Sequence, residues 1–146
     1  GNGMLFEGMQ EEGLKVISNI RDRYDGNKRS PFDEAECGHH YARAMTAYGA
    51  VLALTGFNYS GVDNRMKFNP LEGKYFWANG QTYGTITLSG VDKTGNSIEP
   101  VKVRIDVLGE KPLRIQEFIL RTLGMKSFKK IQAIEEFLEF EVKRTM

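Results

Sequence analysis

Eleven consecutive residues, from Asp33 to Arg43, form the densest group of side chains that could do chemistry. The run reads Asp-Glu-Ala-Glu-Cys-Gly-His-His-Tyr-Ala-Arg, with three carboxylates, two imidazoles and one guanidinium. Carboxylates accept hydrogen bonds from sugar hydroxyls, and a guanidinium donates a fork of them. The run opens an apolar segment that reads as a helix, whose positive dipole end favours ionised acids. The pattern allows a sugar-binding site, although spacing alone favours helix capping by a solvated acidic loop.

Two other chemistries fit the same run less well. Adjacent histidines point in different directions on a helix, and no H-E-x-x-H spacing is present, so a metal site is disfavoured; its ligands would come from Glu36, Cys37, His39 and His40. Cys37 could act as a nucleophile with His39 as its base, but adjacency in sequence is not pairing geometry. We expect no metal, no cofactor and a buried structural cysteine.

A second candidate is an aromatic group on strand-like sequence. Its members could stack on sugar rings, and they are Tyr75, Phe76, Trp77 and Tyr83. Aromatic residues at strand spacing are more often part of a core, so packing is the favoured interpretation. The glycine-rich positions match neither G-x-x-x-x-G-K nor G-x-G-x-x-G, so no phosphate-binding loop is predicted.

The elements that must position these residues begin with two helices. Apolar residues recur at three- and four-residue steps over residues 5–24, which predicts an amphipathic helix. A second helix is predicted from His39 to Thr55, ended by Gly56. It carries no charge after Arg43 and is apolar on nearly every side, so it needs partners all round.

From Asn58 onward the pattern indicates strands. Residues Val101, Val103, Ile105 and Val107 alternate with charged residues, and Asn79-Gly80 is a hairpin-type dipeptide. Ser127 could cap a last helix, because apolar residues recur at helical steps after it. The expected fold is α+β in one domain, residues 1–146: a helical segment over 5–57 packed on an antiparallel sheet of about four strands over 58–124, then a C-terminal helix over 125–146. The alternative is a mostly helical fragment with a loosely attached hairpin.

Composition excludes several classes of function. The chain has 146 residues and a formal net charge of +1, so it lacks the basic character of a protein that binds nucleic acid or an anionic membrane. Its most apolar stretch, residues 44–57, is shorter than the roughly 20 residues of a membrane-spanning helix. The start shows no signal-peptide pattern, and the single cysteine suits a reducing compartment, so we expect a cytoplasmic protein.

Several runs together resemble glycoside hydrolase family 116, the non-lysosomal glucosylceramidases or bile-acid β-glucosidases and their bacterial relatives. They are Glu7-Gly8-Met9, Glu12-Gly13-Leu14, Ile20-Arg21-Asp22-Arg23-Tyr24-Asp25-Gly26, the stretch from Asn27 to Met45 with its E-x-E-C-G and H-Y-A-R patterns, and Leu52-Ala53-Leu54-Thr55-Gly56-Phe57. The resemblance covers residues 7–88, weakens through about 120 and is not apparent in the last segment. Ser30 departs from the asparagine of the family pattern.

This resemblance implies a barrel of six inner and six outer helices that hydrolyses β-glucosides with retention. It places the carboxylate nucleophile and the acid/base upstream of this segment, so this chain would hold no catalytic residue and be inactive alone. It also implies that Glu34 and Arg43 hold glucose hydroxyls, with Asp33, His39 and His40 as neighbours. The partners would be a β-glucoside and the upstream barrel portion or a neighbouring catalytic chain.

Three functional hypotheses follow. The chain could be the C-terminal portion of such a glucosidase, or a free-standing non-catalytic module that binds carbohydrate or protein. The third is an unrelated small enzyme using Glu34, Glu36 and His39. In each case the second helix would leave apolar side chains uncovered in a monomer, so we expect the isolated chain to form a homo-oligomer, through this helix or the last one.

Overall fold

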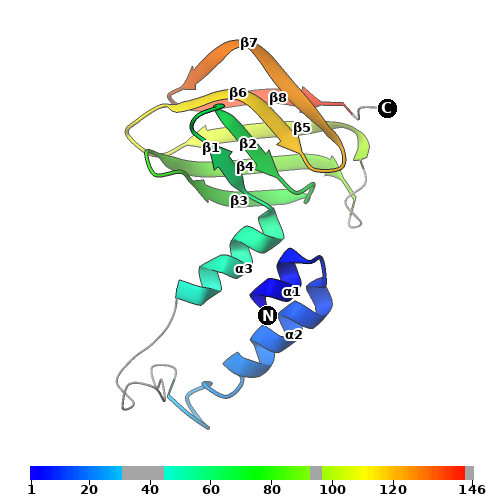
Figure 1. Ribbon diagram of the computed structural model, residues 1–146, viewed down its shortest axis with the longest axis vertical. Coiled ribbons are helices and arrows are strands. Elements are labelled where there is room, and N and C mark those ends of the chain that lie inside the picture. Colours follow the sequence, from blue (N-terminus) through cyan, green and yellow to red (C-terminus); the bar gives the residue numbers. More distant parts are fainter. Residues whose placement is uncertain (31–44, 93–96, 144–146) are drawn as a thin grey trace. The chain divides into compact units, whose positions relative to one another are not determined.

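The computed structural model describes residues 1–30, 45–92 and 97–143 (Figure 1). The chain divides into two compact units, Gly1–Leu54 and Thr55–Met146. The first unit is helical and the second is built of strands, so the predicted α+β class is confirmed. The boundary lies close to the predicted change from helices to strands, and the prediction of one domain stays a prediction.

The first unit holds helices α1 (Asn2–Phe6), α2 (Gln10–Arg21) and most of α3 (Met45–Thr55). The prediction of one helix over residues 5–24 was wrong, because Gly8 adopts φ 83° and ends α1. Left-handed backbone of this kind interrupts a helix. The apolar pattern is kept because Leu5 is buried against α2, where a Cβ on Gly13 would lie 2.6 Å from the Leu5 side chain.

The end of α3 confirms the predicted stop. The helix ends at Thr55, and Gly56 follows with φ 62°. A glycine in this left-handed conformation is a common way for a helix to end. The predicted beginning of this helix, residues 39–44, lies outside the described residues.

The second unit is a sandwich of two four-stranded sheets. One sheet has the order β1-β2-β6-β7 and the other β3-β4-β5-β8. The strands are β1 (Asn58–Ser60), β2 (Arg65–Phe68), β3 (Gly73–Ala78), β4 (Tyr83–Val91), β5 (Ser97–Val107), β6 (Leu113–Leu120), β7 (Gly124–Ile134) and β8 (Phe137–Val142). All neighbours are antiparallel except β2 and β6, which run parallel. The prediction of one sheet of about four strands is corrected to two such sheets.

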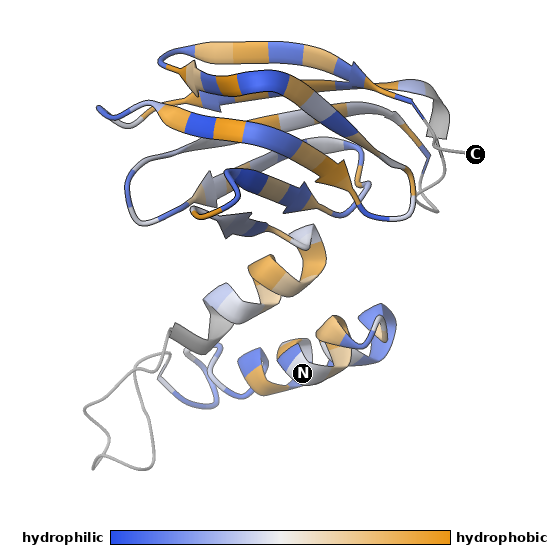
Figure 2. Cartoon of the chain, turned by 45° about the horizontal axis from the view of Figure 1, so that its top comes forward, coloured by the Kyte–Doolittle hydropathy of each residue, from blue (hydrophilic) through white to orange (hydrophobic). Residues whose placement is uncertain are grey.

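Alternation of apolar and polar residues explains why these segments form strands. Figure 2 shows hydrophobic and hydrophilic positions alternating along the arrows of both sheets. In β5 the predicted inward residues Val101, Val103, Ile105 and Val107 are all buried. Successive side chains of a strand point to opposite faces, so each sheet presents one apolar face. The two apolar faces enclose one core that includes Phe68, Trp77, Ile86, Ile115 and Phe118.

The predicted C-terminal helix over residues 125–146 is wrong, because this segment forms β7 and β8. Its apolar spacing fits a helix stripe, but Leu138, Phe140 and Val142 also alternate as a strand requires. Pairing decides between the two: β7 completes the ladder of β6, and β8 that of β5. Phe140 packs edge-on against Phe118, with ring centroids 5.1 Å apart. Ladder hydrogen bonds and core contacts thus override the local helix pattern.

Gly84 provides a test of how closely the strands of the sandwich pack. An added Cβ would collide with the carbonyl oxygen of Asp106 and lie 2.8 Å from Cζ2 of Trp77. We expect Gly84→Ala to lower the free energy of unfolding by about 1–3 kcal/mol or more, measured by urea denaturation. The control is Gly61→Ala, where the nearest atom would be 3.8 Å away. It should change stability by less than about 0.5 kcal/mol, and equal effects of the two variants would contradict the packing described.

Candidate functional site

The predicted sugar-binding residues fall in one part of the chain. Glu34 and Arg43 and their expected neighbours Asp33, His39 and His40 lie outside the described residues, as do Glu36 and Cys37. Their roles therefore stay predictions.

The apolar helix α3 follows the predicted sugar-binding run directly. Three of its large side chains are exposed: Tyr48 at 70%, Val51 at 49% and Leu52 at 44%. The expectation that side chains of this helix would remain uncovered is confirmed for these residues. Side chains of this size are stabilised by burial, so they mark a surface suited to contact with further protein.

The four aromatic residues singled out in the sequence separate into two groups. Trp77 is 1% exposed and belongs to the core, as the packing interpretation predicted, and Tyr75 packs against the core. Phe76 is 58% and Tyr83 48% exposed, so packing was the wrong interpretation for these two. Their ring centroids lie 6.3 Å apart on neighbouring strands, which leaves an aromatic pair facing outward.

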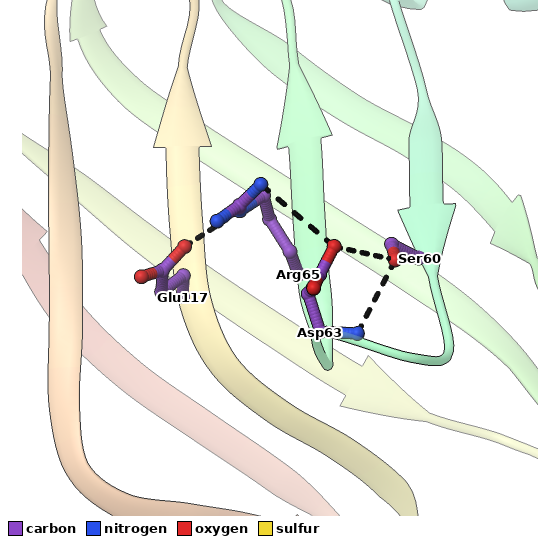
Figure 3. Close-up of polar contacts among 4 residues, drawn as sticks. All are labelled: Ser60, Asp63, Arg65 and Glu117. Carbon is purple, nitrogen blue, oxygen red and sulfur yellow. Dashed lines mark hydrogen bonds and ion pairs between the residues drawn. The ribbon is translucent and has the colours of Figure 1, made fainter.

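A polar cluster joins the β1–β2 turn to β6, and Figure 3 shows its four residues. Nε of Arg65 donates to Glu117 at 2.6 Å, and the same guanidinium lies 3.8 Å from Asp63. The Ser60 hydroxyl donates to Asp63 at 2.9 Å. The hydrogen bond and charge of Glu117 raise the pKa of Arg65 above its ordinary value. Arg65 and Glu117 are Cα partners in the parallel pair, so the ion pair links β2 to β6 in this register.

A cleft of about 790 Å³ opens at the end of the sandwich where three loops meet. Its lining includes Tyr59, Asn64, Asn79, Lys111 and Arg114. The predicted hairpin dipeptide shapes one wall of the cleft. Oδ1 of Asn79 accepts hydrogen bonds from the backbone N–H groups of residues 81 and 82 at 3.0 and 2.9 Å. At another wall of the cleft, the Tyr59 hydroxyl donates a hydrogen bond to the carbonyl oxygen of Arg114 at 2.7 Å. Amides and cations of this kind can orient a small polar ligand.

Sequence reasoning missed this cleft because its residues come from segments far apart in the chain. The Asn79-Gly80 turn was the one signal present, and it predicts a hairpin rather than a binding wall. Within the part of the chain that the structure describes, no group of three or more His, Cys, Asp or Glu residues could hold a metal ion. In that same part, no helix combines the length and apolar character needed to cross a membrane.

No protein-family profile matches the sequence, and no curated protein matches it.

Two half-buried tyrosines predict how stability depends on pH. Burial raises the pKa of Tyr59 and, helped by the charge of Glu72, that of Tyr75 above the ordinary 10.0. Their contribution to stability is therefore complete below about pH 10 and is lost as the pH rises through the folded pKa values. We expect the free energy of unfolding to fall above about pH 10, measured by urea denaturation at several pH values.

The double variant Tyr59→Phe, Tyr75→Phe should show a smaller fall, because it lacks both ionisable groups. Phe76→Leu, which removes an exposed ring but no ionisable group, should keep the full fall. A fall of equal size in the double variant and the parent would contradict the assignment to these two tyrosines.

Proposed function

We propose that this chain is the C-terminal portion of a retaining β-glucosidase similar to glycoside hydrolase family 116. Its role is to complete the glucose subsite of a larger catalytic unit. The proposal is supported by the E-x-E-C-G and H-Y-A-R patterns between Asn27 and Met45, which precede α3 in the sequence.

The exposure of α3 is the structural observation that carries the proposal. An inner helix of a helical barrel is covered by neighbours on all sides, whereas a surface helix needs one apolar stripe. Tyr48, Val51 and Leu52 are exposed in this chain, and a barrel portion supplied by the rest of the enzyme would cover them. The apolar character of α3 thus fits a helix that belongs to a larger helical assembly.

In this proposal the chain positions the sugar and does not cleave it. The Glu34 carboxylate accepts hydrogen bonds from glucose hydroxyls, and the Arg43 guanidinium donates to them. Retaining hydrolysis needs a nucleophilic carboxylate and an acid/base about 5–5.5 Å apart, which the catalytic unit supplies. Hydroxyl contacts that strengthen in the transition state then contribute to the rate through orientation.

Substitution of the two proposed sugar ligands tests this role in the assembled enzyme. With the upstream portion of the gene co-expressed, Glu34→Ala and Arg43→Ala should each lower kcat/KM on an aryl β-glucoside by about 10- to 150-fold, since each removes hydrogen bonds to a charged group. Glu110→Ala, an exposed loop position, is the control and should leave turnover unchanged. Full activity in both variants, or turnover by the chain alone, would overturn the proposal.

The uncovered side chains of α3 also predict self-association of the isolated chain. Burial of each large side chain is worth about 1.5–3 kcal/mol, and two-fold dimers are the commonest oligomers. Light scattering at micromolar concentration should therefore report a species of twice the chain mass. The double variant Val51→Glu, Leu52→Glu should return it to a monomer, whereas Val62→Glu, at a position 93% exposed in the sandwich, should not. A monomeric parent protein would contradict this prediction.

A further inference from the structure

The outer face of the sheet β3-β4-β5-β8 carries an ordered arrangement of aromatic and polar side chains. We define the outer face by its described outward residues: Lys74, Phe76, Tyr83, Thr85, Thr87, Ser89, Lys102, Arg104, Asp106, Phe137, Glu139 and Glu141. Their inward neighbours form the core, so none of these side chains is needed to fill it. Core packing therefore does not dictate which residue types occupy the outer face.

Strand register places four of these residues in one row across the sheet. Phe76 pairs with Thr85, Thr85 with Asp106, and Asp106 with Phe137. Three strand intervals of about 4.8 Å separate the two phenylalanines, which puts them roughly 14 Å apart. Phe76 is 58% and Phe137 52% exposed. The row therefore has an exposed ring at each end and hydrogen-bonding groups between them.

A shallow hollow lies within this face, beside Phe137. Its volume is about 450 Å³, and its lining includes Lys74, Thr85, Arg104, Asp106 and Phe137. At the other end of the row, Tyr83 widens the aromatic platform, with its ring centroid 6.3 Å from that of Phe76. A ligand in the hollow would thus reach an aromatic ring, a hydroxyl, a carboxylate and two cationic donors.

The central polar groups are already ordered without a ligand. Arg104 donates to Asp106 at 2.8 Å and to Glu139 at 2.6 Å, and its guanidinium lies 4.3 Å from the centre of the Phe137 ring. The Thr85 hydroxyl donates to Asp106 at 3.3 Å. Such a network fixes side chains that would otherwise lose rotamer freedom on binding, and this preorganisation favours affinity.

The charges of the outer face balance. Lys74, Lys102 and Arg104 stand against Asp106, Glu139 and Glu141, all on neighbouring positions of the sheet. A surface that binds nucleic acid or an acidic polymer carries an excess of cations. A balanced set of donors and acceptors instead suits a ligand that is uncharged and rich in hydroxyl groups.

We propose that the outer face binds a neutral oligosaccharide, with sugar rings stacked on Phe76 and Phe137 and hydroxyls bonded to Thr85, Asp106 and Arg104. A protein partner fits less well, because protein interfaces have an apolar centre and a polar rim. Here the order is reversed, with rings at the ends of the row and charges in its middle. This site goes beyond the proposed glucose subsite, because it lies in the sandwich and does not involve Glu34 or Arg43.

Binding of the full chain to neutral oligosaccharides tests the proposal. Calorimetric titrations with cellohexaose, laminarihexaose and mannohexaose should show affinity for at least one of them, and titration with an oligogalacturonate, which is anionic, should show none. Phe76→Ala and Phe137→Ala should each weaken binding at least about fivefold, because each removes a stacking platform. Ile131→Ala, an exposed apolar position on β7, is the matched control and should leave affinity unchanged.

Two further measurements keep the result unambiguous. Urea denaturation establishes that the variants fold, and Phe137→Leu, which keeps apolar cover over Arg104 but no aromatic platform, should also lose affinity. The proposal is overturned if none of the three neutral oligosaccharides binds or if binding is indifferent to both phenylalanines. It is equally overturned if Phe76→Ala dissociates a dimer of a chain that binds no saccharide.

Discussion

The closure of two sheets over one apolar layer is the constraint on which the rest of the sandwich depends. Trp77, Ile86 and Ile105 from one sheet and Phe118 and Ile115 from the other are each at most 1% exposed. Since side chains alternate along a strand, this core fixes the direction of every second residue. A slip of one residue in any central strand would turn its apolar set toward water. Function is thereby confined to the outward positions and the loops.

The same constraint sets the spacing of the side chains on the outer face, because the core beneath the sheet holds its strands in register. Phe76 and Phe137 sit on the two edge strands of their sheet, and their separation is decided by the pairing of β4 and β5 between them. Gly84 allows close approach of the strands at this place, next to Trp77. Polar groups held on strands of a rigid sheet are positioned more accurately than groups on loops. The proposed saccharide site thus derives its geometry from the core.

The helical unit has the opposite character, because part of its apolar surface is not covered. Tyr48, Val51 and Leu52 remain exposed on α3 while the sandwich encloses its own core. This contrast links the two proposals: the sandwich presents a finished surface to a ligand, whereas the helices present an apolar surface to further protein.

Part of this fold could be predicted from local patterns. The alternation in β5, the Asn79-Gly80 turn and the stop at Gly56 each follow from a strong local preference, and each is confirmed. The helix predicted for the C-terminal segment was wrong because the apolar spacing there suits both helix and strand. Pairing with the edges of β5 and β6 makes the segment form strands. Phe137 lies in the segment for which the sequence predicts a helix, so its alignment with Phe76 does not follow from that pattern.

The candidate sites differ in the same way: some of their residues follow from one contiguous stretch of sequence, and others depend on which strands pair. The sugar-binding roles of Glu34 and Arg43 are implied by a resemblance carried by one contiguous run, and they stay a prediction because both residues lie outside the described residues. The Arg104 network could not be predicted, since it joins β5 to β8 through a register that no local pattern specifies. Exposure of Phe76 beside buried Trp77 follows from strand alternation once the inward residue is known.

Amide hydrogen exchange of the full chain tests most directly whether one shared core holds both sheets. Amides exchange at the global free energy of unfolding where a segment opens only with the whole unit. The account predicts that the central strands β4 and β5 of one sheet and β6 of the other exchange with one common free energy, equal to that from urea denaturation. Exchange of β6 at a much lower free energy than β4 and β5 would show that the sheets open separately, and would contradict a common core behind the outer face.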